Sequence, residues 1–331
     1  MKPKIKIFNA PGRAVSPLTG ARSHTGGGAQ GTARPTISFR ASAGFTLVEI
    51  LVVVVLMSLI VLALMAVFNS TQAAFRASLT QTDVLEGGRA TMGQLKNDLE
   101  SMTPSGLNPL NPAPNFYAAV SNSCTQTLVS SAASRTNVME DVFFVTRQNQ
   151  TWKGVGYFVR TNLLRASGIG TPGILYRFET NNSAAQFVRN PTNLFGAFNQ
   201  VRNPGGPLAA ANNLTNLPVG VSQILAGVMS FKVRAFDPNG FWITAGHTNI
   251  VAITNINSPE VILYSFSSNA VPVSVEVELG VLEDRALQRV QSLPNVAPGW
   301  AQSNYLAQQA GKVHVFRQRF PIRNVDPWAY Q

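Results

Sequence analysis

One uninterrupted apolar segment constrains this chain more than any other feature of its sequence. Between Phe45 and Phe68 the chain reads FTLVEILVVVVLMSLIVLALMAVF, and Glu49 is the only charged residue in it. A helix of this length is about 36 Å long, which is enough to cross the roughly 30 Å hydrocarbon core of a bilayer. No other stretch of the sequence is comparable. The sequence therefore predicts a single membrane-spanning helix over residues 45–68.

The residues before this segment indicate how it is oriented and processed. Residues 1–44 contain no acid and seven of the basic residues behind the net charge of +11, namely Lys2, Lys4, Lys6, Arg13, Arg22, Arg34 and Arg40. Such an excess of Lys and Arg marks the cytoplasmic flank of a span. A secretory signal peptide has its small-residue cleavage site after the apolar region. Here the small residues 41–44 precede that region, so cleavage would remove a basic leader, residues 1–44, and keep the helix.

The hexapeptide Gly44-Phe45-Thr46-Leu47-Val48-Glu49 resembles the processing site of type IV prepilins and type II secretion pseudopilins. The resemblance implies that a prepilin peptidase cuts between Gly44 and Phe45, and that the new amine of Phe45 is methylated. It also implies that Glu49 sets the register between adjacent subunits. A carboxylate in hydrocarbon costs several kcal/mol unless it is paired. The free amine of Phe45 is a natural partner, in the same chain or in a neighbouring one.

The same resemblance implies the partners and the location of the protein. The partners would be the prepilin peptidase, other pilin or pseudopilin subunits, an inner-membrane assembly platform and membrane lipid. The protein would cross the bacterial inner membrane once, with its head in the periplasm or in an extracytoplasmic filament. No cofactor and no catalytic residue are implied, because cleavage belongs to the peptidase and assembly to an ATPase.

An amphipathic helix is predicted to continue beyond the span. Apolar and small residues recur at spacings of three and four, which gives a stripe of Leu85, Gly88, Met92, Leu95, Leu99 and Met102. Pro104 then ends a helix of residues 45–103. Its first half lies in membrane or filament core, and its second half presents the stripe to a head. Gly87, Gly88 and Gly93 either permit close packing or bending, or are local weaknesses of the helix.

The rest of the chain predicts a β-rich head. Residues 104–136 are rich in Pro, Asn and Ser and read as a connector, which places the head at residues 137–331. The Asn-, Pro- and Gly-rich residues 181–220 read as a long surface loop. Runs of β-branched and aromatic residues predict strands at Asp141–Gln148, Gly154–Thr161, Gly173–Glu179, Val228–Phe236 and Val271–Leu282. The expected fold is α+β, a long amino-terminal helix packed on an antiparallel sheet.

A second, weaker resemblance concerns the head. The order of a Tyr-containing strand, the strand Leu175-Tyr176-Arg177, the turn at residues 236–240, Trp242 and a strand beginning near Pro272 is similar to J- or W-type minor pilin subunits. The head is also large for a major pilin. Both observations favour a minor, tip or specialised subunit.

Two patterns that could indicate an active site have simpler interpretations. Residues 168–173 match GxGxxG, but a dinucleotide site needs a helix after the motif. Here Pro172 and a strand follow, so we expect a hairpin loop. Glu276 and Glu278 would lie about 7 Å apart on one strand face, near the spacing of glycosidase carboxylates. Nothing nearby suggests a sugar cleft, and we expect a solvated face.

The sequence predicts no metal site. Cys124 is the only cysteine, which excludes an intrachain disulfide and a thiolate cluster. Residues 237–240 predict a turn rather than a calcium loop, because a chain of oxygen ligands is missing. The histidines have no ligand-spaced partners and are expected on the surface, in loops or in the leader: His24, His247 and His314.

The carboxyl-terminal tail combines Arg317, Arg319 and Arg323 with Phe316, Phe320 and Trp328. Such a tail could stack on bases and pair with phosphates. The seven charges of the leader leave only four of the net +11 for the rest of the chain, which is mild for a nucleic-acid binder. We expect an edge strand and a packed terminus, without a nucleic-acid partner.

These patterns together predict a structural subunit and not an enzyme, namely a minor pilin or pseudopilin of a type IV pilus or a type II secretion filament. Two alternatives stay open. A membrane-anchored binding module, such as a DNA-uptake or adhesin subunit, would share the amino terminus. An anchored periplasmic enzyme would need a grouping of acid, histidine and nucleophile, which the sequence does not show.

Overall fold

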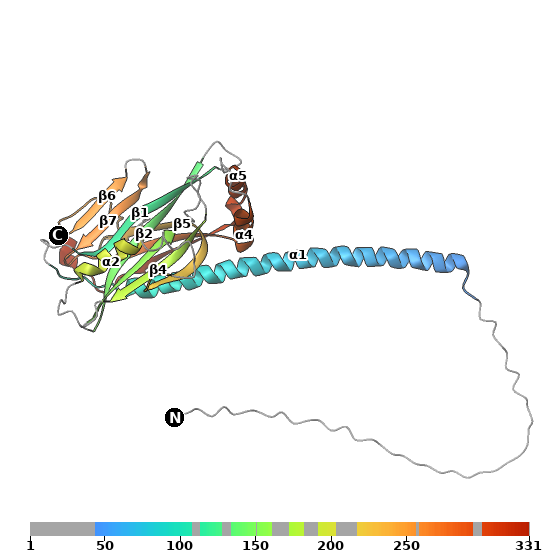
Figure 1. Ribbon diagram of the computed structural model, residues 1–331, viewed down its shortest axis with the longest axis horizontal. Coiled ribbons are helices and arrows are strands. Elements are labelled where there is room, and N and C mark those ends of the chain that lie inside the picture. The colour runs from blue at the N-terminus through green and yellow to red at the C-terminus, as the bar shows by residue number, and fades with distance from the viewer. Residues whose placement is uncertain are drawn as a thin grey trace, which may run out of the picture. The chain divides into compact units, whose positions relative to one another are not determined.

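The computed structural model describes residues 44–107, 113–127, 134–149, 151–160, 172–181, 191–202, 217–255, 258–293 and 300–330. The chain divides into two compact units, Met1–Ala63 and Leu64–Gln331. Helix α1, Leu47–Glu100, begins in the first unit and ends in the second (Figure 1). The predicted leader is residues 1–44, and all of it except Gly44 lies outside the described residues.

Within the described residues, nine strands of the second unit form one sheet. Its order is β6-β7-β1-β2-β3-β4-β5-β8-β9, and each neighbouring pair is antiparallel. The strands are β1 (Pro114–Thr127), β2 (Ser134–Gln148), β3 (Thr151–Arg160), β4 (Gly173–Asn181), β5 (Val221–Phe236), β6 (Ile250–Asn255), β7 (Ser258–Ser267), β8 (Ser274–Leu282) and β9 (Val313–Pro321). The predicted α+β fold, a long apolar helix packed on an antiparallel sheet, is confirmed.

The predicted strands correspond to β2, β3, β4, β5 and β8, and the expected edge strand in the tail is β9. The predicted connector needs correction, because β1 and the start of β2 lie within residues 104–136. The sequence of β1, PNFYAAVSNSCTQT, has few β-branched residues. This strand is nevertheless paired on both edges, by β2 and β7, so its main-chain hydrogen bonds and its tertiary packing override a weak local preference.

The predicted long loop at residues 181–220 also needs correction, because helix α2, Thr192–Arg202, lies within it. Leu194, Phe198 and Val201 are buried on one side of this helix. Their spacing of four and three residues is the signal of an amphipathic helix, although the surrounding Asn and Pro residues suggested a loop. The GxGxxG residues 168–171 lie outside the described ranges, and the motif's last glycine, Gly173, begins β4.

Helix α1 packs one stripe of its carboxyl-terminal half on the sheet. The buried residues of the helix are Val84, Gly88, Thr91, Met92, Leu95 and Leu99, and Met102 is buried just after its end. The predicted stripe differs at two positions: Val84 is buried in place of Leu85, which is 36 % exposed, and Thr91 is buried although it was not predicted. The strands contribute side chains to the same hydrophobic core as this stripe, among them Val142, Phe144, Val155, Leu175, Val277 and Leu279.

Helix α2 covers the other face of the sheet at β2, β3 and β4. Phe198 lies against Phe143, Phe158 and Phe178 there, with ring centroids 5.3–6.0 Å apart. Gly156 is needed in β3, because a Cβ atom at this position would overlap the ring of Phe198. The middle strands are therefore buried on both faces, by α1 and by α2.

The buried carboxylate of Glu140 lies where β2 and β5 make a contact in addition to the neighbouring pairs of the sheet. The two strands share a parallel bridge between Met139 and Phe231. The next residue of β2, Glu140, is 1 % exposed, and its Oε2 atom accepts a hydrogen bond of 2.6 Å from the backbone amide of Val233. Burial raises the pKa of Glu140 to about 8. The side chain thus supplies an acceptor that the diverging backbone of β2 does not provide.

Short helices lie at the two ends of β8 and β9. Helix α4 (Asp284–Ser292) follows the end of β8, and α5 (Trp300–Gln308) and the 3₁₀ turn η1 (Ala310–Lys312) precede the start of β9. The 3₁₀ turn η2 (Pro327–Tyr330) follows the other end of β9, and the Tyr330 hydroxyl donates to the Val271 carbonyl ahead of β8. This arrangement gives the head two chemically distinct ends.

Candidate functional site: the two halves of helix α1

The predicted processing residues lie at the start of α1, where the helix is closed by reciprocal hydrogen bonds. The Oγ1 atom of Thr46 accepts from the backbone amide of Glu49, and Oε2 of Glu49 accepts from the backbone amide of Thr46, each at 3.3 Å. The first helical bond follows, from the Ile50 amide to the Thr46 carbonyl at 3.2 Å. This is a capping box, in which Thr46 is the N-cap and Glu49 is the third helical residue.

The capping box places the Glu49 carboxylate one residue from the predicted new terminus. Phe45 is 78 % exposed, and a Cβ atom built on Gly44 would meet no heavy atom within 4 Å. The peptide bond between them is therefore sterically open. The motif Thr-x-x-Glu was readable in the sequence, but the sequence analysis assigned Glu49 only to subunit register and missed its role as a helix cap.

The apolar half of α1 makes no buried contact. The large apolar side chains from Phe45 to Phe68 are between 49 and 80 % exposed. One helix in the described chain is long and apolar enough to cross a membrane, and it is this one. Exposing a contiguous apolar surface to water is unfavourable in proportion to its area. This half of the helix therefore requires a lipid or protein environment.

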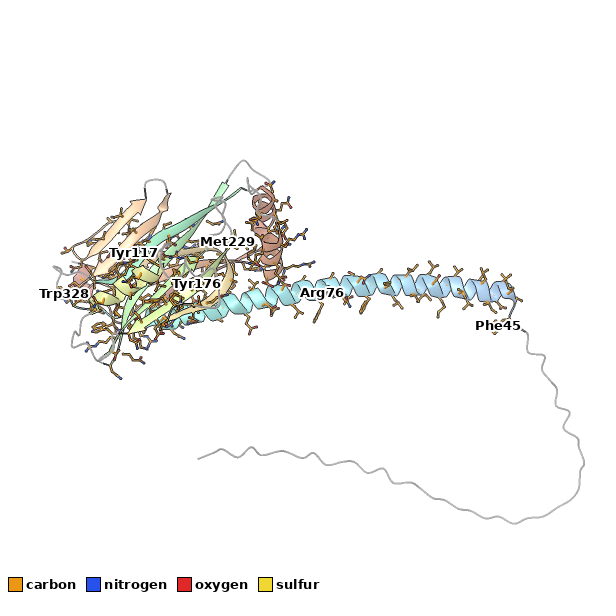
Figure 2. All side chains as sticks on the ribbon, viewed as in Figure 1. Phe45, Arg76, Tyr117, Tyr176, Met229 and Trp328 are labelled. Atoms are coloured by element: carbon orange, nitrogen blue, oxygen red, sulfur yellow. The ribbon has the colours of Figure 1, made fainter. Side chains whose placement is uncertain are left out.

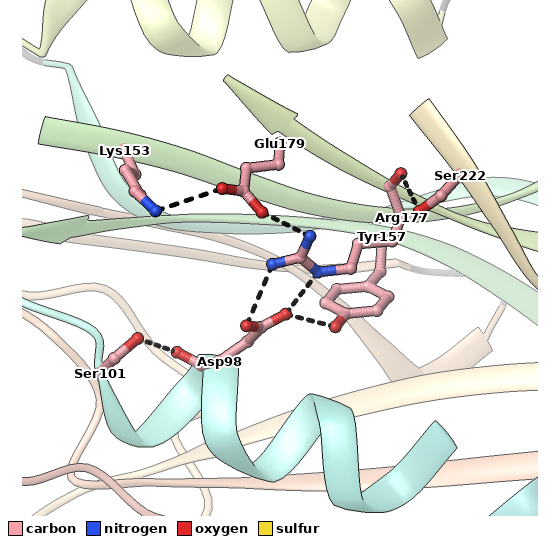
Figure 3. A network of polar contacts seen from close by, with 7 residues as sticks. All are labelled: Asp98, Ser101, Lys153, Tyr157, Arg177, Glu179 and Ser222. Atoms are coloured by element: carbon pink, nitrogen blue, oxygen red, sulfur yellow. Dashed lines mark hydrogen bonds and ion pairs between the residues drawn. The ribbon is translucent and has the colours of Figure 1, made fainter. Parts of the chain in front are cut away.

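The other half of α1 is joined to the sheet by a polar network (Figure 3). The Asp98 carboxylate accepts from the Tyr157 hydroxyl at 2.5 Å and from two nitrogens of Arg177, Nε at 2.7 Å and Nη2 at 3.1 Å. The Nη1 atom of Arg177 donates to Glu179 at 2.6 Å, and Lys153 lies 3.3 Å from the same carboxylate group. A bidentate arginine pair of this kind fixes both distance and orientation.

The environment of the network changes the pKa of several members. Burial raises the pKa of Tyr157, and the neighbouring Asp98 carboxylate raises it further. The hydrogen bond from Arg177 lowers the pKa of Glu179. The tyrosine therefore stays a neutral donor and the acid stays a charged acceptor at neutral pH, which holds Arg177 between two carboxylates.

A second set of contacts joins α1 to β9 and the residues after it. Phe316 of β9 covers Gly88, where a Cβ atom would overlap the ring. Further along, Arg323 pairs with Glu100 at 2.5 Å, and the Asn324 side chain donates to the Met102 carbonyl at 3.1 Å. Close packing is thus the observed role of Gly88. Gly93 has no neighbour within 4 Å and has no such role.

The other sequence candidates take ordinary structural places. Glu276 accepts from Arg317 at 2.8 Å and lies 3.5 Å from Arg234, on the face that β8 shares with its neighbours. His314 lies 3.3 Å from Glu283. The turn predicted at residues 237–240 is present, with a hydrogen bond from the Gly240 amide to the Asp237 carbonyl. The described residues contain no cluster of three or more metal-ligating side chains.

Sequence reasoning missed two adjacent buried acids, Glu140 and Asp141. They point to opposite faces of β2, and Asp141 lies 3.5 Å from Arg202 of α2. Burial raises the pKa of Asp141 as it does that of Glu140. Glu140 contacts a backbone amide in the core rather than an open cleft, so its observed chemistry is structural. The only sequence signal was the pair of acids inside the otherwise apolar run of residues 138–145.

A comparison with protein families agrees with the prediction for the amino-terminal segment. The model of the prokaryotic N-terminal methylation motif matches residues 39–65. A solved structure of a type IV-like pilin from Thermus thermophilus is similar over 73 % of this chain and 95 % of that chain, with 11 % sequence identity and a TM-score of 0.30. No curated protein matches the sequence. The chain thus carries a methylation motif, which implies processing by a prepilin peptidase, at the start of a long helix that packs on an antiparallel sheet.

Proposed function

We propose that the protein is a minor pilin or pseudopilin, a structural subunit of a type IV pilus or a type II secretion filament. Prepilin peptidase cuts the precursor between Gly44 and Phe45, and the amine of Phe45 is then methylated. Residues 1–44 stay in the cytoplasm, the span at residues 45–68 anchors the subunit in the inner membrane, and the head lies outside. Other subunits and an inner-membrane assembly platform are the partners.

One observation carries this proposal: the methylation motif occupies the capped start of a helix whose apolar half is entirely exposed. Before assembly, lipid would cover this apolar surface. In a filament, the same surface of neighbouring helices would cover it. A simple membrane anchor needs the apolar surface but has no need of a cleavage site in front of it.

Glu49 has two separable roles in this proposal. As a cap it needs only an oxygen acceptor, which Gln supplies as well as Glu. As the partner of the Phe45 amine it needs a negative charge, because an uncharged amide does not neutralise an ammonium group in hydrocarbon. After cleavage, the amine would lie one residue from the Thr46 amide that the carboxylate already contacts.

Two variants distinguish these roles in cells that make the protein. We expect Glu49→Ala and Glu49→Gln to be cleaved like the wild type, and both to be largely missing from sheared filaments or from the assembled pseudopilus. Incorporation would be measured by immunoblot of the filament and membrane fractions. Thr46→Val, which disturbs the cap and keeps the charge, is the matched control and should still be incorporated. Normal incorporation of Glu49→Gln would reject charge-based register and leave Glu49 as a helix cap only.

A further inference from the structure

Two aromatic side chains are exposed at one end of the head. Phe241 is 71 % and Trp328 is 73 % exposed, and no other aromatic residue after α1 whose side-chain exposure is described reaches this degree. Figure 2 labels Trp328 at this end. The apolar ring of an exposed tryptophan stays in contact with water in the free molecule. Tryptophan is enriched at interfaces, where a partner covers the ring. We call Phe241 and Trp328, together with Asp237 and Asp326 beside them, the aromatic end.

Phe241 and Trp328 come from neighbouring turns. Phe241 closes the turn after β5, with its amide bonded to Asp237 Oδ1 at 2.7 Å. The Phe236 carbonyl at the start of this turn accepts from the Val273 amide at 3.0 Å, and the Tyr330 hydroxyl of η2 donates to the Val271 carbonyl at 2.5 Å, which places the turn beside η2. The amide of Trp328 in η2 donates to Asp326 at 3.0 Å. Neither Asp237 nor Asp326 forms an ion pair within the described chain, so the aromatic end has two carboxylates without a cation.

The opposite end of the head exposes three cations. Arg285 and Arg289 lie on the exposed side of α4, whose buried side is Ala286, Leu287 and Val290. Lys312 ends η1 next to this helix, where its carbonyl accepts from the Glu283 amide at 3.2 Å. None of these three cations has an ion-pair partner among the described residues. We call Arg285, Arg289 and Lys312 the basic end.

Local stability explains only part of the basic end, namely Arg289 in the last turn of α4, where the helix dipole favours a cation. Arg285 and Arg289 are four residues apart on a helix, where like charges repel each other. Arg285 also lies in the first turn, beside the positive end of the helix dipole. The only acid in that turn, Asp284, already accepts a hydrogen bond from Gln288 at 2.7 Å. A partner that supplies carboxylates and aromatic rings would offset the repulsion between the two arginines and the repulsion between Arg285 and the helix dipole.

The two ends cannot meet within one molecule. Strand β9 runs from η1 at the basic end toward η2 at the aromatic end, and nine extended residues span about 30 Å. Figure 1 shows α4 and α5 at one end of the sheet, away from the position of Trp328 in Figure 2. Any pairing of the aromatic end with the basic end therefore joins two molecules.

We propose that the aromatic end of one copy docks on the basic end of a second copy, head to tail. Arginine stacks on tryptophan and phenylalanine rings through cation–π attraction. The head already uses this contact internally, since Arg319 lies 3.4 Å from the ring centroid of Phe236 and Arg234 lies 5.2 Å from that of Trp242. Asp237 and Asp326 supply the complementary charge. In a head-to-tail dimer, one molecule keeps a free basic end and the other keeps a free aromatic end. Further copies can add at both, which gives an open row.

The proposal rests on the filament role proposed above, because a filament holds its subunits parallel, and it requires copies of this subunit to be neighbours there. It is tested by cross-linking full-length protein in the membranes of cells that make it. In a Cys124→Ser background, one cysteine replaces Asn239 at the aromatic end and another replaces Gln291 on α4. Both positions are exposed and lie outside the proposed contacts. A bismaleimide should then give dimers, trimers and longer species from the double-cysteine protein.

Three kinds of control sample decide the geometry: single-cysteine proteins, variants of the proposed contacts and a variant away from them. Each single-cysteine protein should give no dimer, because a head-to-tail contact does not bring identical positions together. Trp328→Ala, Phe241→Ala and the double change Arg285→Glu with Arg289→Glu should each lower the cross-linked fraction several-fold in the double-cysteine protein. Ile253→Ala, which truncates a side chain 59 % exposed on β6, is the matched control and should leave the cross-linked fraction unchanged.

The outcomes separate this proposal from the filament role. The amino-terminal peptide is measured by mass spectrometry in the same membranes. A methylated Phe45 terminus without a cross-linked ladder overturns the head-to-tail contact and leaves the filament role standing. A ladder that survives Trp328→Ala and Arg285→Glu with Arg289→Glu also overturns it, as do dimers from a single cysteine. A ladder from an unprocessed protein keeps the contact and rejects the filament role.

Discussion

Helix α1 is one continuous helix, but one half exposes its apolar side chains and the other half buries them on the sheet. From Phe45 to Phe68 the helix exposes its large apolar side chains and holds one carboxylate at its capped start. From Val84 to Leu99 it buries a narrow stripe and fixes it with polar contacts to strands far away in sequence. The first half is built for an environment that the chain does not supply, and the second half is built for this particular sheet. The difference predicts that substitutions act on separate properties in the two halves.

The largest effect on the head is expected where α1 meets β4. Arg177→Ala leaves the Asp98 carboxylate, 19 % exposed, without its bidentate partner. Removing one member of a largely buried pair costs about 3–5 kcal/mol of unfolding free energy. Urea unfolding of full-length protein in detergent, followed by tryptophan fluorescence, would measure this loss. Arg177→Lys keeps the charge and loses the bidentate geometry, so it should lie between the two; equal stability of all three proteins would contradict a fixing role for the network.

The matching change in the apolar half should leave the head intact. Val54→Asp puts a charge into the middle of the span, which disfavours insertion by about 3 kcal/mol. We expect much less protein in the membrane fraction, with Val54→Ala close to the wild type. Urea unfolding of the head should change by less than about 0.5 kcal/mol, the usual range for an exposed site away from the core. A large loss of head stability would show that the two halves are not separable.

The buried Glu140 predicts how the stability of the head depends on pH. Its pKa rises from 4.5 to about 8 on folding. Below pH 4.5 both states hold the proton, whereas at higher pH the unfolded chain releases it and the folded chain keeps it. Stability should therefore fall by several kcal/mol as pH rises from about 4.5 to about 8, and level off above. Glu140→Gln keeps the acceptor for Val233, so most of this slope should disappear; an unchanged slope would assign it to other groups.

The smallest predicted effect compares two glycines of the same helix. Gly88→Ala forces the Phe316 ring away and should cost about 1–3 kcal/mol of unfolding free energy. Gly93→Ala meets no neighbour and should gain up to about 1 kcal/mol from helix propensity. Melting temperatures of the two variants in detergent would measure the difference. Equal effects of both substitutions would remove the evidence that β9 packs closely on α1.

The sequence predicted the first half of α1 better than the second. A long apolar run and a local hexapeptide are contiguous signals, and both were readable without a fold. The stripe of the second half was also periodic, so its burial was predicted except that Val84 is buried in place of Leu85 and that Thr91 is buried as well. The partners of that stripe were not predictable, because Asp98 and Arg177 are 79 residues apart and no local pattern joins them. Arg177 had been noted only as part of a strand similar to those of minor pilins.

Other parts of the head escaped prediction for identifiable physical reasons. Strand β1 is stabilised by two neighbouring strands rather than by its own residues, so its composition resembled a connector. Helix α2 is held on β3 by the contact between Phe198 and Gly156, and the helix lies between Asn- and Pro-rich segments. The capping box at Thr46 and Glu49 was visible in the sequence. It was overlooked because the same carboxylate already had a proposed function.

The central claim is that the exposed half of α1 becomes the amino terminus of the mature protein. The most direct test is the intact mass and the amino-terminal peptide of the protein isolated from bacterial membranes. We expect a chain that begins at N-methylated Phe45. A chain that begins at Met1, or one that is cut after residue 68, would contradict it and leave the head as a simply anchored or secreted β domain.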